Sequence, residues 1–271
     1  MFNNVQLPSE FLLLWMKNNL LPEKEQQVFN TYYKGYIDLF PKRMQYFYDK
    51  QLEDALKILS KIENPKVLEI GCGLGTESLF MSLKGADVLG IDIKDDRINT
   101  ATKRKEIIED SINKKLNCDF KNISVLELNE DTKYDLIWIE QAYHHLEPRE
   151  DVSNKISKLL KDDGYLIISE ANAWNALLQI LLFKRRGFNT INYYEDSKGK
   201  KHIYGDERIL TSSSLSKIFY KYNINKVNIK YFRLFPNKVF FNKFFKIEKE
   251  FPKFLYMFFT HYNYIGRKSK Q

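Results

Sequence analysis

The 271-residue chain has only two cysteines, Cys72 and Cys118, and no long apolar segment. Two thiols without the spacing of metal ligands do not form a disulfide framework, and they fit a reducing compartment. A membrane-spanning helix needs about 18 consecutive apolar residues, whereas the longest apolar stretches, 176–183 and 254–259, are far shorter. The N-terminus also lacks the basic n-region of a signal peptide. We therefore expect a cytoplasmic protein.

Basic residues are concentrated toward the C-terminus. The formal net charge is +8, but residues 172–271 contain 20 Lys and Arg against 6 Asp and Glu, whereas residues 1–171 contain 23 against 29. This asymmetry predicts an anionic partner or acceptor for the C-terminal part. An alternative interpretation is that a protein rich in Lys and Asn simply has a Lys-rich surface.

Apolar periodicity predicts alternating strands and helices in the middle of the chain. A helix at 46–62 precedes the break at Asn64-Pro65. Strands are then expected at 66–70, 87–91, 116–120, 134–139 and 165–169, with helices at 76–84, 95–114 and 149–160. Because strand–helix–strand crossovers are right-handed, this order predicts a doubly wound α/β fold with a mostly parallel sheet.

Four segments follow from this pattern. They are a helical, aromatic N-terminal appendage at 1–45, a core at 46–172, an inserted lid or cap at 173–212, and the remainder of the core at 213–271. A break as long as this insertion is commonly a lid or a binding element. After it, Thr211-Ser-Ser-Ser214 is predicted to cap a helix at 215–222, and the closing strands are expected at 227–235 and 262–268.

Glycines 71, 73 and 75 directly follow the first predicted strand and precede a helix. Without a Cβ atom, they let the backbone turn sharply and approach a ligand closely. The loop departs from the GxGxxG spacing of dinucleotide sites, and Glu69 before it disfavours a pyrophosphate but suits a cationic amino group. Asp92 ends the next predicted strand, where a carboxylate binds both ribose hydroxyls. Together these residues predict a nucleoside cofactor that carries an amino acid.

Five segments, in this order and spacing, resemble the successive motifs of the class I S-adenosylmethionine-dependent methyltransferases. They are Val67-Leu-Glu-Ile-Gly-Cys-Gly-Leu-Gly-Thr76, Gly90-Ile-Asp92, Tyr134-Asp-Leu-Ile-Trp138, His144-His-Leu146 and Leu159-Leu-Lys-Asp-Asp-Gly-Tyr-Leu166. The resemblance implies a Rossmann-like sheet of seven strands whose last strand is antiparallel. It also implies S-adenosylmethionine as the cofactor at the glycine loop.

The resemblance assigns cofactor contacts to individual residues. It implies that Glu69, Gly71 and Gly73 contact the methionine end and that Asp92 binds the ribose. Ser124 and Val125 would lie beside the adenine, although the family often has Asp at the position of Ser124. The expected cofactor-binding set is completed by Cys72, Gly75, Ile93 and Glu140. Cys72 occupies a variable loop position and needs no reactive role.

His144 and His145 follow the fourth predicted strand, at the edge where open α/β sheets bind ligands. A histidine there can act as the base that methyl transfer to a hydroxyl requires. Glu170, at the end of the fifth strand, would orient a histidine or hold an acceptor hydroxyl. This pattern is similar to that of sugar O-methyltransferases. Alternatively, the histidines pack against the cofactor, since many class I enzymes keep a histidine at the position of His145 for that purpose.

The sequence gives less support for metal binding by the histidines and for acceptor contacts from the insertion. Adjacent histidines seldom point at one ion, and the sequence shows no Cys, His or Asp cluster with them, so no metal site is expected. His202 and Tyr204 in the insertion are candidates for contacts with the acceptor.

Residues 238–259 combine phenylalanines with lysines. Phenylalanines 240, 241, 244, 245 and 251 share one face of a predicted helix, and lysines 243, 246 and 249 lie largely elsewhere. Such a segment can lie on an anionic membrane surface, here the inner membrane face. Alternatively, its aromatic face packs on the sheet. With the insertion and the ending Tyr264-Ile-Gly-Arg-Lys268, it loosely resembles the extra elements of methyltransferases from polysaccharide and glycolipid pathways.

The sequence therefore predicts a methyltransferase acting on a hydroxyl of a small-molecule, sugar or glycolipid-type acceptor. One alternative is an RNA methyltransferase that uses the basic C-terminal region, but no RNA-binding module is recognisable, and Glu140-Gln-Ala-Tyr143 replaces a tetrapeptide of the Asn-Pro-Pro-Tyr type. Another is a non-catalytic protein that keeps the fold for binding or assembly. The intact set of Gly71, Gly73 and Asp92 argues against it.

Overall fold

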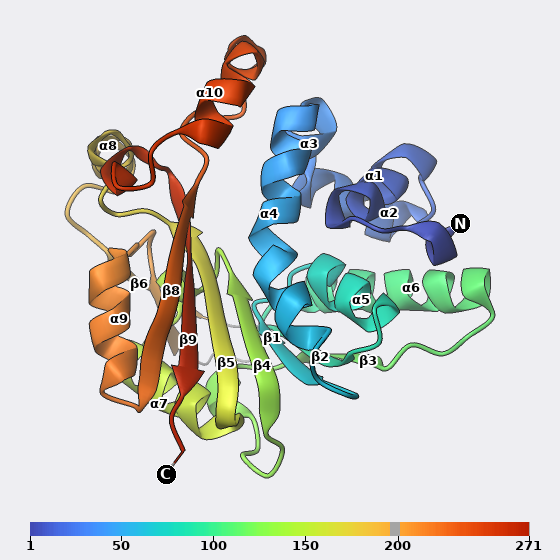
Figure 1. Cartoon of the computed structure of the whole chain (residues 1–271). Helices are drawn as coiled ribbons and strands as arrows, with labels where there is room; N and C mark the ends of the chain where they lie inside the picture. Colours follow the sequence, from blue (N-terminus) through green and yellow to red (C-terminus); the bar gives the residue numbers. More distant parts are fainter. Residues whose placement is uncertain (196–200, 271) are drawn as a thin grey trace. The chain divides into compact units, whose positions relative to one another are not determined.

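The computed structural model describes residues 1–195 and 201–270, and the side chains of residues 194, 195 and 202 lie outside that description. Seven strands form one sheet, in the order β3 (Cys118–Asn122), β2 (Asp87–Asp92), β1 (Lys66–Ile70), β4 (Tyr134–Glu140), β5 (Leu160–Ala171), β9 (His261–Lys268) and β8 (Ile224–Phe232) (Figure 1). Strands β1 to β3 are parallel to one another, as are β4 and β5, whereas β9 is antiparallel to both β5 and β8. The predicted Rossmann-like fold with an antiparallel last strand is thereby confirmed.

The chain divides into two compact units. Unit 1 comprises residues 1–128 and 237–245, and unit 2 comprises residues 129–236 and 246–271. Unit 1 thus joins the predicted N-terminal appendage to the first half of the predicted core. Unit 2 holds the predicted insertion, and each unit contributes its own set of candidate site residues.

Most helices of unit 1 come from the first part of the chain. The helices of this unit are η1 (Phe2–Asn4), α1 (Pro8–Asn18), α2 (Glu23–Tyr32), α3 (Lys34–Asp38), α4 (Lys42–Leu59), α5 (Thr76–Leu83), α6 (Asp95–Ile112), η2 (Val125–Glu127) and η4 (Val239–Phe244). Helices α4, α5 and α6 lie within a few residues of the predicted bounds. The appendage is helical, as its sequence indicates.

A buried arginine joins the appendage to the glycine loop. The Arg104 guanidinium, on α6, lies 4.5 Å from the ring centroid of Trp15 and 5.3 Å from that of Phe29. It donates hydrogen bonds to the Leu74 carbonyl at 2.7 Å and to Thr76 Oγ1 at 2.6 Å. Because a guanidinium is planar and weakly hydrated, it can stack on aromatic rings while its edge donates hydrogen bonds. The aromatic helices therefore support the backbone on which the predicted cofactor site depends.

Unit 2 contains the remaining helices and a separate hairpin. They are η3 (Tyr143–His145), α7 (Arg149–Leu159), α8 (Ala176–Arg186), β6 (Ile191–Glu195), β7 (Lys201–Gly205), α9 (Ser212–Tyr220), α10 (Phe245–Glu250) and η5 (Tyr256–Phe258). The hairpin strands β6 and β7 are antiparallel, and the sequence analysis did not anticipate them. The predicted cap of α9 is confirmed, because Thr211 Oγ1 accepts a hydrogen bond from the Ser214 backbone N–H at 3.1 Å.

The prediction of one helical face over 238–259 is wrong. The segment is divided among η4, α10 and η5, and Phe251 lies beyond the end of α10. Pro252 explains the break, since a residue that precedes proline is disfavoured in the α conformation. Phe251 instead contacts the rings of Phe258 and the buried Phe259. Across 1–195 and 201–270, no helix combines the length and apolar character that crossing a membrane requires.

Replacing Arg104 with Met should destabilise the protein by about 2 kcal/mol, because the buried Leu74 carbonyl loses its charged donor. Lys103→Met is the matched control, since Lys103 forms only an exposed ion pair with Glu106 on the same helix, and we expect it to change stability by less than about 0.5 kcal/mol. Urea unfolding measures both effects. Equal stability of the two variants would show that the buried guanidinium does not hold the loop.

Candidate active site

The glycine loop between β1 and α5 adopts a backbone that requires glycine. Gly71, Gly73 and Gly75 have φ angles of 75°, 52° and 70°. A Cβ atom on Gly73 would lie 2.3 Å from Tyr32 Oη, and one on Gly75 would lie 2.5 Å from Phe120 Cζ. Conformation and close approach therefore both select glycine at these two positions. The loop presents backbone rather than side chains, as a closely bound cofactor requires.

Asp92 is fixed beside this loop at the end of β2. Its Oδ2 accepts a hydrogen bond from the Gly73 backbone N–H at 3.0 Å, and its Oδ1 accepts one from the Lys94 backbone N–H at 2.9 Å. Arg97 Nη1 lies 3.5 Å from Oδ2. The structure thus brings together the two parts of the predicted nucleoside site, the loop and the strand-end carboxylate.

Glu69 and Cys72 are buried in the same part of unit 1. Glu69 accepts a hydrogen bond from the Ser78 hydroxyl, so the first turn of α5 orients its carboxylate. Burial, together with the charges of Glu69 and Asp92, raises the pKa of the Cys72 thiol. Since the thiolate is the nucleophilic form, Cys72 stays protonated and unreactive, which agrees with the absence of a predicted reactive role.

The residues predicted to lie beside the adenine and ribose differ in exposure. Ile93 is exposed directly after Asp92, whereas Val125 is buried in the core of unit 1. Ser124 is half-buried and caps η2, because its hydroxyl accepts a hydrogen bond from the Leu126 backbone N–H at 3.3 Å. Ile93 and Ser124 therefore keep surface that a ligand can contact. Glu140 ends β4 in unit 2, where it is half-buried.

Tyr32 is a candidate cofactor residue that the sequence analysis did not identify. Its hydroxyl lies against Gly73, and the Arg97 guanidinium is 5.2 Å from its ring centroid. Its neighbour Tyr33 is hydrogen-bonded to Thr76 Oγ1 at 2.5 Å. The concentration of tyrosines at the end of α2 was the available signal, but no local pattern relates these residues to a loop much later in the chain.

In unit 2, the turn η3 places His144 against Glu170 at the end of β5. His144 is buried, and its Nδ1 lies 2.6 Å from Glu170 Oε2. The His144 backbone N–H donates a second, longer hydrogen bond of 3.3 Å to Oε1. When Nδ1–H donates to the carboxylate, the neutral ring keeps its lone pair on Nε2. The predicted pairing of a histidine with Glu170 is what the structure shows.

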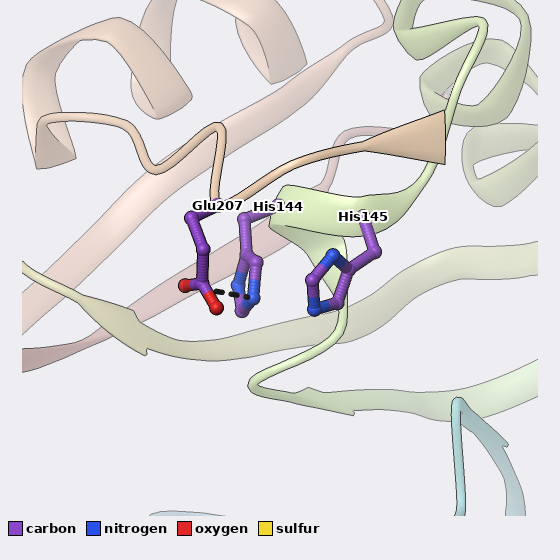
Figure 2. Close-up of side chains that lie close together, drawn as sticks. All are labelled: His144, His145 and Glu207. Atoms are coloured by element: carbon purple, nitrogen blue, oxygen red, sulfur yellow. Dashed lines mark ion pairs between the residues drawn. The ribbon is translucent and has the colours of Figure 1, made fainter. Parts of the chain in front are cut away.

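The end of the hairpin supplies two further groups. His145 Nδ1 lies 2.7 Å from the Gly205 carbonyl, to which it can donate, and this bond also leaves Nε2 with a lone pair. Glu207 Oε2 lies 3.8 Å from His144 Nε2. Figure 2 shows the two rings side by side, with the Glu207 carboxylate next to His144. Gly205 permits this approach, because a Cβ atom there would lie 2.1 Å from the His144 carbonyl oxygen.

Burial and the neighbouring charges shift the pKa values of His144 and His145 in opposite directions. Burial lowers the pKa of His144, but the carboxylates of Glu170 and Glu207 outweigh it and raise that pKa above its usual value. Burial and the neighbouring His144 lower the pKa of His145. His145 is therefore the more weakly basic ring, and His144 is the ring whose protonated form the site stabilises.

One ligand atom from each of His144, His145 and Glu207 lies within 4.8 Å of the other two. The histidine pair is therefore accompanied by an acidic group, which the sequence analysis did not foresee because Glu207 comes from the far end of the insertion. Of the two weaker candidates, Tyr204 forms a backbone bridge with Leu146, and the side chain of His202 lies outside the described residues. The cluster can accept a proton or coordinate a cation.

Replacing Glu170 with Gln should lower the pKa of His144, because the ring loses the carboxylate that most strongly opposes burial. Glu207→Gln should lower it less, since Glu207 is farther from the ring. Titration of the imidazole signals by NMR measures both shifts, with Glu150→Gln as the control on the exposed surface of α7. An unchanged pKa in Glu170→Gln would contradict the geometry described for this pair.

Comparison with known proteins agrees with the fold and the loop. A family model described as a methyltransferase domain matches residues 40–229. The ubiquinone biosynthesis O-methyltransferase of Pelagibacter ubique (strain HTCC1062) is 31% identical over 146 residues, which are 53% of this chain and 58% of that one. The phosphoethanolamine N-methyltransferase of Plasmodium falciparum (isolate 3D7) is 38% identical over 125 residues, 44% of this chain and 45% of that one. The chain spans about half the length of these curated relatives.

Solved structures show the same fold. A putative sarcosine dimethylglycine methyltransferase from Galdieria sulphuraria superposes with a TM-score of 0.62 at 15% identity, covering 92% of this chain and 99% of that one. The magnesium protoporphyrin IX methyltransferase of Synechocystis PCC 6803, solved with bound SAH, has a TM-score of 0.56 at 15% identity, covering 90% and 97%. The match of the family model over most of the chain shows that this protein belongs to the class I S-adenosylmethionine-dependent methyltransferases.

Proposed function

We propose that the protein transfers the methyl group of S-adenosylmethionine to a hydroxyl of a small-molecule, sugar or glycolipid-type acceptor, with His144 as the base. The observation that carries this proposal is the 2.6 Å hydrogen bond between His144 Nδ1 and Glu170, which leaves Nε2 as the proton-accepting atom. The name of the Pelagibacter relative, an O-methyltransferase, supports an oxygen acceptor. The N-methyltransferase of Plasmodium keeps an amine acceptor as the alternative outcome.

Unit 1 fits the cofactor of the family. The loop offers backbone where a Cβ atom would collide, and Asp92 offers a carboxylate positioned by two backbone N–H groups. We assign Asp92 and Ile93 to the nucleoside, Ser124 and Val125 to the neighbourhood of the adenine, and Glu69, Gly71, Cys72, Gly73 and Gly75 to the remaining contacts. The bound cofactor supplies an electrophilic methyl group on a sulfonium, so the chain need only position the acceptor and remove its proton.

In unit 2, His144 accepts the proton of the acceptor hydroxyl at Nε2 while its Nδ1–H stays bonded to Glu170. The carboxylate holds the ring in one tautomer and stabilises the imidazolium that forms. Glu207, near Nε2, adds to that stabilisation. His145, whose pKa is lowered, stays neutral and forms the adjacent wall of the site. Glu170 is thus a positioning residue.

Asp92→Asn should weaken binding of S-adenosylmethionine about 10- to 100-fold, because the ribose hydroxyls lose a charged acceptor. Asp95→Asn, a change of the same kind in the first turn of α6, should leave the affinity unchanged. Isothermal titration calorimetry measures both constants. If the unmodified protein fails to bind S-adenosylmethionine, the enzymatic proposal fails with it.

The acceptor class can be found by incubating the protein with radiolabelled S-adenosylmethionine and separate cell-extract fractions of RNA, protein, lipid and soluble small molecules. We expect label in the small-molecule or lipid fraction. Label in RNA would overturn the proposed acceptor class, and label on nitrogen in the purified product would overturn the hydroxyl. Turnover that is lost with a chelator and restored by a divalent cation would replace the base with a metal at the same cluster.

With the labelled fraction as substrate, His144→Ala should lower kcat about 10²- to 10⁴-fold and leave the affinity for S-adenosylmethionine unchanged. In the unmodified protein, the rate should rise with pH as His144 loses its proton, with a midpoint above the usual value of about 6.5 because its pKa is raised. The groups that face this ring are Glu170, Glu207 and Arg149, together with the adjacent ring of His145. In Glu170→Gln the midpoint should move to lower pH, and unchanged turnover in His144→Ala would exclude the base.

A further inference from the structure

Helix α8 turns an apolar stripe toward water. Leu177, Ile180 and Leu181 are 74%, 51% and 64% exposed, whereas Leu182 is the residue of this helix that is buried. These positions follow the i, i+3, i+4 spacing that normally faces a protein core. Phe188, just beyond the helix, is 90% exposed and contacts only the ring of the exposed Phe183 among the ring pairs of the described residues. An apolar surface of this kind marks an interaction site.

A second segment extends the stripe. The side chain of Asn172 donates to the Tyr256 carbonyl and that of Asn175 donates to the Phe258 carbonyl, each at 2.9 Å. Figure 1 shows the red segment that follows α10 lying beside α8. This segment adds two more exposed aromatic side chains, Phe254 and Phe258. We call the group formed by Leu177, Ile180, Leu181, Phe188, Phe254 and Phe258 the α8 surface, and it lies entirely within unit 2.

The two segments that form the α8 surface carry basic residues and no acidic ones. Lys184 is exposed and continues the stripe seven residues after Leu177, and Arg185 and Arg186 follow it at the end of the helix. Lys253 is exposed in the second segment. The sequence contains no Asp or Glu from 171 to 194 or from 251 to 260. An apolar stripe bordered by cations is complementary to a partner that has an apolar interior and a negatively charged outer layer.

We propose that the α8 surface docks on an anionic lipid bilayer. The leucine, isoleucine and phenylalanine side chains enter the boundary between headgroups and acyl chains, and Lys184, Arg185 and Arg186 contact lipid phosphates. A second copy of this chain is a poorer partner, because the segments 171–194 and 251–260 would bring lysines and arginines from both copies to the contact and no Asp or Glu. The proposal places the membrane contact on α8 rather than on a single helix over 238–259.

The position of α8 connects the bilayer to the proposed acceptor site. The helix begins five residues after β5 ends, and Glu170 stands at that end of β5. At its other end, Arg185 Nη1 lies 3.2 Å from Glu207 Oε1, and the second oxygen of Glu207 faces His144. An acceptor held in the bilayer would therefore reach unit 2 at the end where His144 lies. Docking itself is independent of the proposed methyl transfer.

Flotation of the full chain with vesicles tests the proposal. We expect binding to phosphatidylcholine vesicles that contain phosphatidylglycerol, weaker binding at high salt, and little binding to pure phosphatidylcholine. The triple variant Leu177→Ser, Ile180→Ser and Leu181→Ser should reduce binding at least about tenfold, because three exposed apolar side chains are lost. Lys184→Ser should reduce it about fivefold on the mixed vesicles alone.

Two controls keep the result specific. The variant Tyr220→Ser with Val227→Ser removes exposed apolar side chains of α9 and β8, and it should bind as the unmodified protein does. Thermal melting shows whether each variant remains folded. Absence of binding to the mixed vesicles, or equal binding by a folded triple variant, would overturn the proposal. So would loss of binding in Val239→Ser with Phe240→Ser alone, or a dimer in solution that the triple variant abolishes.

Discussion

Hydrogen bonds attach the glycine loop to the end of strand β2, and the proposed cofactor site of unit 1 depends on this attachment. The backbone N–H groups of Gly71 and Cys72 both donate to the Ile91 carbonyl, at 2.8 and 2.9 Å, and that of Gly73 donates to Asp92. These bonds hold three consecutive loop residues and one carboxylate in a single geometry. Arg104 holds the other side of the loop through Leu74. A loop with so few degrees of freedom can present backbone to a cofactor without reorganising.

The proposed acceptor site lies in unit 2, where the inserted hairpin adds a carboxylate to residues that follow the strands. His144 lies in the turn η3 that follows β4, and Glu170 lies in the last two residues of β5. Gly205 then lets the hairpin backbone approach His144, and Glu207 follows with its carboxylate near Nε2. Connecting segments tolerate insertions without disturbing the sheet, so in the proposed reaction the hairpin can shape the acceptor site while the sheet keeps its geometry.

Predictions from the sequence succeeded where the signal was local. The features are the loop, the ends of β2 and β5, and the cap of α9. A few adjacent residues determine each of these features, because they are compatible with few other local structures. The predictions failed where distant residues decide the outcome. The segment 238–259 has a helical pattern, yet Pro252 interrupts it and its parts belong to different units. The role of Tyr32 at Gly73 and that of Glu207 at His144 come from contacts between segments far apart in the chain.

The sequence by itself determined the fold class, the loop and the placing of the histidines and Glu170 at one edge of the sheet, because strand order in a doubly wound sheet brings strand ends to one edge. Only the tertiary structure decided which histidine meets Glu170, how a buried Arg104 joins the aromatic appendage to the loop, and that the apolar side of α8 faces outward. Apolar periodicity predicts that a helix has an apolar side. It does not predict which residues, solvent or partner that side contacts, because burial depends on the packing of the whole chain.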